Sequence, residues 1–229
     1  MRKLRAVVML AVAALLGAPA YAADYIPPPE YKIPELPPVD YGLGGSFYLR
    51  GSVGGALWHA RDGSYCGCVA TFSGPGYGYS LGLGLGYETG EGLRTDVTID
   101  FLSINGLTAT GGTTVNLRSG LALANIYYDF ALDHGGYSAE GGIGLYAGLG
   151  IGAAYNYSEL STGAWGTSLE AAGAVMAGVS YDMGAAVADV GYRGIYMNKV
   201  MDQPAAGNTY IINHNFIHEV RGSLRYRFH

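Results

Sequence analysis

The chain has 229 residues, and its 13 Lys and Arg against 18 Asp and Glu give a formal net charge of −5 at pH 7. This acidic balance argues against a nucleic-acid partner, because surfaces that bind nucleic acid are basic. The 38 Gly and 20 Tyr indicate β structure, since Gly weakens helices and Tyr favours strands and membrane interfaces.

The N-terminal residues have the three parts of a secretory signal peptide in order. Arg2, Lys3 and Arg5 form a basic start, residues 6–16 form an apolar run, and Ala20-Tyr21-Ala22 fits the small-x-small cleavage rule. We therefore expect residues 1–22 to be removed, leaving a mature chain that starts at Ala23. No later stretch reaches 18 uninterrupted apolar residues, so the sequence predicts no transmembrane helix after this segment.

Two further segments stand apart from the rest of the chain. Residues 23–44 are rich in Pro and read as an extended linker on the periplasmic side. Cys66 and Cys68 are separated only by Gly67, so they cannot connect distant parts of the fold, and a disulfide between them would close a strained ring. A small loop feature and a redox or intermolecular contact both remain open for this pair.

From Gly45 onward, short runs with a side-chain period of two recur between turn residues, as in β-strands. In residues 215–229 one face ends in Tyr226 and Phe228, while the other carries four charged residues. In the fourth run Leu121 disagrees in parity with Ile126, and a β-bulge would reconcile them. The predicted strands are residues 46–58, 77–87, 93–101, 115–128, 145–155, 168–183, 186–196 and 215–229.

Eight strands of about ten residues suit a barrel that crosses an outer membrane. Connections at 88–92 and 184–185 are short, whereas those at 58–76, 103–114, 156–167 and 199–211 are predicted to be long surface loops. Aromatic residues near the strand ends would form two girdles at the membrane interfaces. These are Trp58, Tyr77, Tyr87, Tyr128, Tyr155, Tyr181 and Tyr226. The predicted fold class is therefore all-β, an eight-stranded antiparallel transmembrane β-barrel over residues 45–229.

Several blocks also resemble a known family. Phe47-Tyr48-Leu49-Arg50-Gly51, the segment 124–130 (ANIYYDF), the segment 177–182 (AGVSYD), Gly191-Tyr192-Arg193 and the segment 218–228 (HEVRGSLRYRF) are similar to the small, porin-like outer-membrane surface-antigen proteins of α-proteobacteria. The resemblance implies an eight-stranded barrel with a structural, envelope-integrity or host-contact role, and some relatives are associated with haem. It also implies that the barrel-assembly machinery reads Leu224, Tyr226 and Phe228 as an insertion signal. The family usually ends on the aromatic residue, whereas His229 follows Phe228 here.

By parity, five cations and five anions point into the lumen. An eight-stranded barrel has an interior that side chains can fill, and buried charges must be paired. We therefore expect a closed, ion-paired plug, with a narrow ion-selective path as the alternative. The predicted lumen charge network is Arg50, Arg94, Asp96, Asp100, Glu170, Asp189, Arg193, Glu219, Arg221 and Arg225.

Other chemistry has weaker support in the sequence. The Gly repeats at 82/84/86 and 148/150/152 lack the spacing of a phosphate loop and are expected to leave room for bulky lumen residues. None of the five His residues is followed at plus two by Ser, so the His-x-Ser pair of lipid A deacylases is missing, and we predict no enzyme and no catalytic residues. His59, His134, His214 and Met201 are available as haem ligands, but nothing in their pattern selects a cofactor or a metal.

The function expected from the sequence is structural. We expect a barrel in the bacterial outer membrane that contributes to envelope integrity and presents surface loops, with its lumen closed by paired charges. The expected partners are outer-membrane lipid and lipopolysaccharide, the barrel-assembly machinery, and an extracellular ligand contacted through the loops. A small channel for ions or solutes and a surface protein that binds haem or a host ligand are the alternatives.

Overall fold

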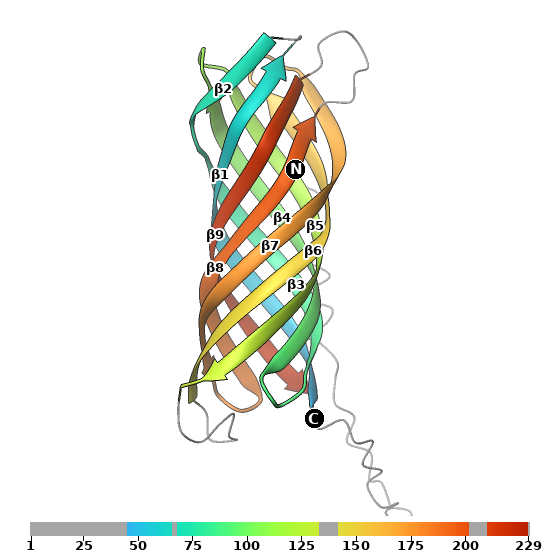
Figure 1. Ribbon diagram of the computed structural model, residues 1–229, viewed down its shortest axis with the longest axis vertical. Helices are drawn as coiled ribbons and strands as arrows, with labels where there is room; N and C mark the ends of the chain where they lie inside the picture. The colour runs from blue at the N-terminus through green and yellow to red at the C-terminus, as the bar shows by residue number, and fades with distance from the viewer. Residues whose placement is uncertain (1–44, 66–67, 133–141, 202–209, 229) are drawn as a thin grey trace, which may run out of the picture. The chain divides into compact units, whose positions relative to one another are not determined.

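Alternating residues along the chain build a single antiparallel sheet that closes on itself (Figure 1). The computed structural model describes residues 45–65, 68–132, 142–201 and 210–228. The predicted signal peptide and Pro-rich linker, Cys66, His134 and His229 lie outside these ranges. Among the described residues, no helix is long and apolar enough to cross a membrane.

Nine strand segments form the sheet, and each pairs with its neighbours in antiparallel register. β9 pairs with β1 from Phe47↔Phe228 to Tyr65↔Tyr210, which closes the ring. The segments are β1 (Ser46–Tyr65), β2 (Cys68–Gly74), β3 (Gly76–Glu88), β4 (Leu93–Ala109), β5 (Thr114–Ala131), β6 (Gly142–Leu160), β7 (Trp165–Asp182), β8 (Ala186–Met201) and β9 (Tyr210–Phe228).

The nine segments occupy eight positions around the ring, because β2 and β3 share one. Both lie between β1 and β4: β3 pairs with their lower parts and β2 with their upper parts. Only Pro75 separates them, and proline has no N–H to donate to a sheet. The predicted eight-stranded barrel is therefore confirmed, with one of its positions broken at Pro75.

The strands are longer than predicted. β4 to β7 have 17 to 19 residues each, whereas about ten suffice to cross a bilayer. Most of the expected surface loops are strand instead, and the turns between β4 and β5 and between β6 and β7 are residues 110–113 and 161–164. The predicted loop at 58–76 is the upper part of β1 together with β2. The clear alternation in the sequence ends before the strands do, because strand pairing continues up to Thr108↔Thr114 and Val115↔Leu160.

The two ends of the barrel differ. β1 begins and β9 ends at the lower end in Figure 1, beside the turn between β3 and β4. β2 and the turns at 110–113 and 161–164 lie at the opposite, upper end. Positive-φ glycines make these turns possible, for example Gly112 (φ 86) and Gly163 (φ 89).

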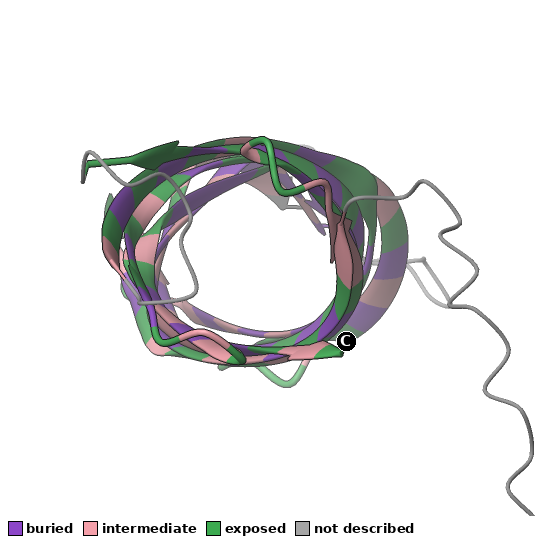
Figure 2. Ribbon diagram, turned by 90° about the horizontal axis from the view of Figure 1, so that it is seen from below, coloured by how far each residue is buried: buried purple, intermediate pink, exposed green. Residues whose placement is uncertain are grey.

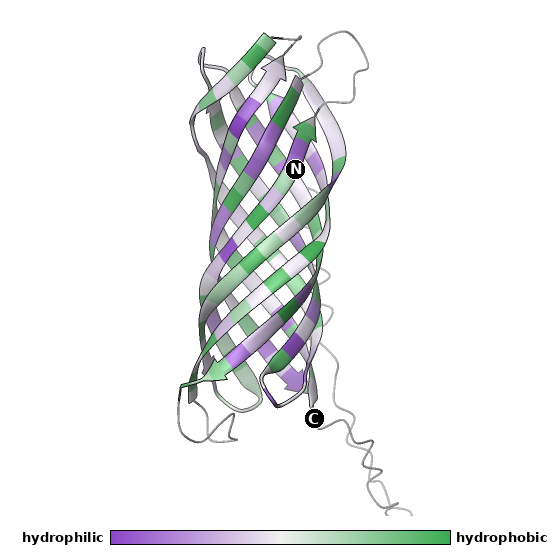
Figure 3. Cartoon of the chain, viewed as in Figure 1, coloured by the Kyte–Doolittle hydropathy of each residue, from purple (hydrophilic) through white to green (hydrophobic). Residues whose placement is uncertain are grey.

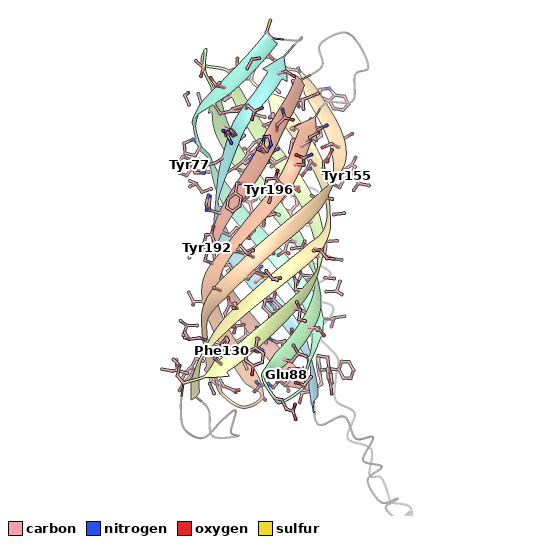
Figure 4. The ribbon with its side chains drawn as sticks, in the orientation of Figure 1. Tyr77, Glu88, Phe130, Tyr155, Tyr192 and Tyr196 are labelled. Atoms are coloured by element: carbon pink, nitrogen blue, oxygen red, sulfur yellow. The ribbon has the colours of Figure 1, made fainter. Side chains whose placement is uncertain are left out.

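The outer surface carries an apolar belt between two aromatic bands. In the middle of β3, outward Leu81, Leu83 and Leu85 are more than half exposed. Tyr77, Tyr155 and Tyr196 project near the upper edge of this belt and Phe130 near its lower edge (Figure 4). Apolar and polar residues alternate along the strands (Figure 3). This belt is the surface that a bilayer-spanning barrel presents to lipid.

Candidate functional site

The lumen is the candidate site, because the strands direct one residue in two toward it and these side chains are buried. Buried and exposed residues follow one another along the strands of the ring (Figure 2). The contents of the lumen change along the barrel axis. Arg and acidic side chains fill the lower part of the lumen, and apolar side chains fill the upper part. We call these the lower zone and the upper zone.

In the lower zone, Asp96 lies at the centre of one group of charges. Arg50 Nη1 donates to its Oδ2 at 2.9 Å, Asn125 Nδ2 to its Oδ1 at 2.7 Å, and the Tyr48 hydroxyl to Oδ2 at 2.9 Å. Beside it, Arg94 binds Asp129 through two bonds of 2.9 and 3.1 Å. The carboxylate of Asp96 is therefore fully engaged.

Tyr127 joins the two arginines of this group. Its hydroxyl accepts a hydrogen bond from Arg50 Nη1 at 2.8 Å, and the Arg94 guanidinium lies 4.0 Å from the centre of its ring. A cation over an aromatic face is stabilised by the ring quadrupole. Tyr127 was not among the predicted site residues, and yet it holds both cations in place.

A second group is built around Arg193. Its Nη1 donates to Asp100 Oδ2 at 2.8 Å, and its Nε donates to Glu219. Arg221 Nη2 lies 3.6 Å from Asp100 Oδ1 and donates to the Ser52 hydroxyl. The Nε and Nη1 atoms of Arg221 are buried without a hydrogen-bond partner among the described residues.

A third group lies at the lower end. Arg225 binds Asp189 through two parallel bonds of 3.0 Å each, and its Nη1 donates to Glu88 at 3.2 Å. Arg227 pairs with Glu88 and donates to Asp182 at 2.8 Å. Arginine pairs carboxylates well in this way because its planar fork matches their geometry.

Nine of the ten residues predicted for the charge network lie in these three groups. Five further members of these groups were not predicted. Glu88 and Asp129 lie just beyond the predicted strands 77–87 and 115–128, in predicted turns. Tyr127, Asp182 and Arg227 lie within predicted strands but were not assigned to the network.

The prediction for Glu170 is wrong. Its side chain is half-buried on β7 and forms no ion pair with the described residues. In its row of the sheet, Ala154 and then Leu121 separate it from Asp100, so no inward-facing cation lies beside it. Residue parity predicts which face of the strand Glu170 occupies. It does not predict how far along the barrel axis Glu170 lies from the charge groups.

The upper zone is an apolar core. Trp58 is fully buried there, and its indole Nε1 donates to Asn215 Oδ1 at 3.0 Å. Trp58 is therefore a lumen residue and not part of an aromatic girdle as predicted. Around it pack Leu102, Ile104, Leu107, Leu117, Ile195 and Ile217, each 0% or 1% exposed.

The ambiguous parity of the fourth predicted strand is resolved within the same core. β5 keeps one register against β6 from Val115 to Ala131, so it contains no bulge in this pairing. Leu121 and Leu123 point inward, whereas Ile126 and Tyr128 point outward. The two parities are compatible because apolar side chains occupy both faces of β5: Leu121 and Leu123 belong to the buried core, whereas Ile126 and Tyr128 face outward.

The glycine repeats leave room for bulky lumen side chains, as predicted. A Cβ atom on Gly148 would lie 2.3 Å from Tyr127 Cδ1, and one on Gly86 would lie 2.4 Å from Tyr48 Cζ. A Cβ atom on Gly191 would lie 2.1 Å from the Tyr146 hydroxyl. These glycines thus make space for aromatic rings that reach across the lumen wall from other strands.

The outer surface holds the remaining candidates. Leu224, Tyr226 and Phe228, the predicted insertion signal, all point outward and are about half exposed. His59 and His218 also point outward with ring centres 5.4 Å apart, and His218 Nδ1 shares a 2.7 Å hydrogen bond with the Tyr192 hydroxyl. Within the described ranges, no group of three His, Cys, Asp or Glu residues could hold a metal ion.

Comparison with solved structures identifies the architecture. Neisserial surface protein A matches with a TM-score of 0.53 and 22% identity, covering 81% of this chain and 99% of that one. The fold is that of a small outer-membrane β-barrel. Two further structures match more distantly. OprG of Pseudomonas aeruginosa has a TM-score of 0.43 and 18% identity, covering 81% of this chain and 97% of that one. The attachment invasion locus protein Ail of Yersinia pestis, solved in complex with a heparin analogue, has a TM-score of 0.40 and 15% identity, covering 80% of this chain and 99% of that one. No family model matches the sequence, and no curated protein matches it.

The apolar belt and the closed ring agree with this architecture. A closed barrel satisfies every backbone hydrogen bond within the sheet, which is what a membrane-spanning structure needs, and outer-membrane barrels carry such a belt between aromatic girdles. In barrels of this type the periplasmic turns are short, and residues 89–92 and 183–185 form short connections at the lower end.

Proposed function

We propose that this protein is a structural outer-membrane barrel with a sealed lumen, which presents the upper end of its wall outside the cell. One observation carries the proposal: side chains fill both zones of the lumen, with different chemistry in each. The lower zone is filled by ion-paired side chains, and the upper zone by a packed apolar core.

The upper zone is the stronger barrier to ions. An ion that entered between Trp58 and Ile217 would meet no charged partner, because the buried residues around them are apolar or, like Asn215, polar but uncharged. The idealised cost of moving an ion from water to such a medium is of order 20 kcal/mol. The lower zone adds a second barrier, because its guanidinium groups are held by carboxylates.

A narrow ion path is the alternative that one observation favours. Arg221 Nε and Nη1 and Glu219 Oε1 are buried without a hydrogen-bond partner among the described residues, and polar atoms of this kind attract water or ions. They lie below the apolar core, so a path through them would still have to cross the upper zone.

Single-channel recording decides between these two functions. The mature protein, refolded and checked by its heat-shifted gel mobility, is placed in a planar bilayer under voltage. We expect no steady conductance from it. Reproducible steps that change in Asp100→Ala or Arg221→Ala would show that the lumen is a path, and the sealed barrel would then be rejected.

The finer role follows from what lies outside the lumen. Above the belt the outward residues become charged, with Arg61 on β1, Arg118 on β5 and Glu159 on β6, so the wall continues into water. This projecting end supports a role in contact with lipopolysaccharide and with an external partner. Such a role also fits the resemblance to the α-proteobacterial surface antigens.

Assembly is the remaining part of the proposal. Leu224, Tyr226 and Phe228 are outward on the last strand, where an assembly machinery could read them before the barrel closes against β1. Removing Phe228 and His229 should lower the amount of protein in the outer membrane. Normal levels of the truncated chain in isolated outer membranes would contradict this role.

A further inference from the structure

A cavity opens at the upper end of the barrel, above the apolar core. Its volume is about 190 Å³, and β1, β2, β4, β5, β6 and β9 all contribute to its lining. We call it the mouth cavity. Its apolar walls are formed by Ala70, Phe72, Val115, Leu160, Ile211 and Ile212.

The described residues that line the mouth cavity include no charged side chain. Five of them carry hydroxyl groups, and two of these are already engaged: the Thr110 hydroxyl shares a 2.8 Å hydrogen bond with that of Thr71, and the Tyr210 hydroxyl shares one of 2.7 Å with Ser158. A charged ligand would lose its hydration here without gaining a partner, so the lining selects against it. The chemistry favours an uncharged, apolar molecule.

The rim of the mouth cavity is held by backbone hydrogen bonds. Thr110 N donates to Thr71 O at 2.7 Å, which ties the β4–β5 turn to β2, and Ser161 N donates to Thr114 O at 2.8 Å, which ties the β6–β7 turn to β5. Ligand pockets are largely formed before the ligand arrives. These bonds mean that little order has to be created on binding.

The mouth cavity has a closed floor. Below it Leu107, Leu117 and Trp58 are 1%, 0% and 0% exposed and belong to the packed core. A molecule that enters from outside therefore stops there. The geometry provides a place of binding and not the start of a passage.

We propose that the mouth cavity binds a small uncharged apolar molecule of about the size of one or two fused rings. An apolar cavity of about 150 Å³ is large enough to take up benzene, so 190 Å³ suits such a ligand. This inference goes beyond the sealed-barrel function. It is tested without any conductance measurement, so the two proposals fail independently.

Photolabelling with 3-(trifluoromethyl)-3-phenyldiazirine, a small uncharged aromatic probe, tests the proposal. The refolded protein in lipid vesicles is irradiated with increasing probe, and labelled positions are mapped by mass spectrometry. We expect labelling at Thr110 and Thr162 to saturate and to fall at least two-fold with excess fluorobenzene. Labelling of belt residues such as Leu83, which face lipid, should rise in proportion to the probe and resist competition.

Variants that fill the mouth cavity give the control. Val115→Phe and Leu160→Trp add volume to its wall and should abolish the competed labelling, whereas Leu83→Phe on the belt should leave it unchanged. If the buried variants fail to show a heat-shifted mobility, Ala109→Phe at the rim replaces them. Sodium benzoate, the charged analogue, should not compete.

Three results would overturn the proposal. One is labelling at the rim that never saturates, which would show only partition of the probe. Another is saturable labelling that survives in folded variants with a filled cavity, which would place the ligand elsewhere. The third is equal competition by benzoate and fluorobenzene, which would contradict the apolar selectivity.

Discussion

Replacing Arg225 by Met should strongly destabilise the barrel. Arg225 is 1% exposed and gives two 3.0 Å bonds to Asp189, whose side chain is 3% exposed. Without it, Asp189 keeps, among the residues that the structure describes, the Ser223 hydroxyl at 3.1 Å as its one hydrogen-bond partner. Breaking a buried pair by removing one partner costs about 3–5 kcal/mol, which is roughly a 150- to 5,000-fold change in the unfolding equilibrium constant.

Urea unfolding in lipid vesicles, followed by tryptophan fluorescence and gel mobility, measures this loss. Two comparisons identify its origin. The double variant Arg225→Met/Asp189→Leu should recover much of the stability, because no charge is left unpaired. His214→Ala removes the 3.2 Å pair with Asp62, in which both side chains are about half exposed, and should cost less than about 1 kcal/mol.

The reasoning would be refuted if Arg225→Met cost no more than His214→Ala. Asp189 would then have water around it in the folded protein, and the lower zone would be a wet channel. A double variant as unstable as Arg225→Met alone would also contradict it, since the loss would then come from packing and not from the stranded carboxylate.

Three further results are expected. Gly148→Val should destabilise the barrel by about 1–3 kcal/mol in the same unfolding assay, because the new Cβ would displace the Tyr127 ring. Gly173→Ala is the control: a Cβ there has no neighbour within 4 Å, so the free energy of unfolding should change by less than about 0.5 kcal/mol. The variant Trp165→Phe keeps only Trp58, which is 0% exposed, and the variant Trp58→Phe keeps only Trp165, which is 60% exposed. Acrylamide should therefore quench the fluorescence of Trp165→Phe far less than that of Trp58→Phe. Equal quenching of the two variants would contradict the buried upper zone. In the variant Cys66→Ser, a membrane-impermeant maleimide should label the exposed Cys68 on intact cells. In the variant Cys66→Ser/Cys68→Ser/Ala131→Cys, the new cysteine at the lower end should react only after the outer membrane is permeabilised. The reverse pattern would show that the barrel has the opposite orientation in the membrane.

The sequence was sufficient to predict the barrel because successive side chains of a paired strand must point to opposite faces of the sheet, so the alternation of apolar residues reveals the strands. A residue such as Leu83 must face lipid if Gly82 and Gly84 face the lumen, and the structure confirms this. Strand ends were harder to locate. Above the belt, both faces of a strand such as β6 carry polar residues, including Asn156 and Glu159, and a period of two then has no contrast to reveal it.

The sequence predicts most of the charged residues of the lumen, but not the division of the lumen into a lower and an upper zone. Parity assigns Arg193 and Glu219 to the inside, and they are one pair across β8 and β9. It cannot say how high on the tilted wall a residue lies, which is why Glu170 was placed among the cations. The apolar upper zone escaped prediction for a related reason: inward Leu121 and outward Ile126 differ in no property that the sequence displays.

The upper turns also determine what an antibody would recognise. Because β4 to β7 continue as paired strands to the four-residue turns at 110–113 and 161–164, the described surface at that end is assembled from side chains of neighbouring strands. An antibody raised against the folded barrel would bind residues that are close in space but far apart in sequence. Linear peptides copied from these turns would be poor immunogens, and a vaccine antigen made from this protein would have to keep the barrel intact.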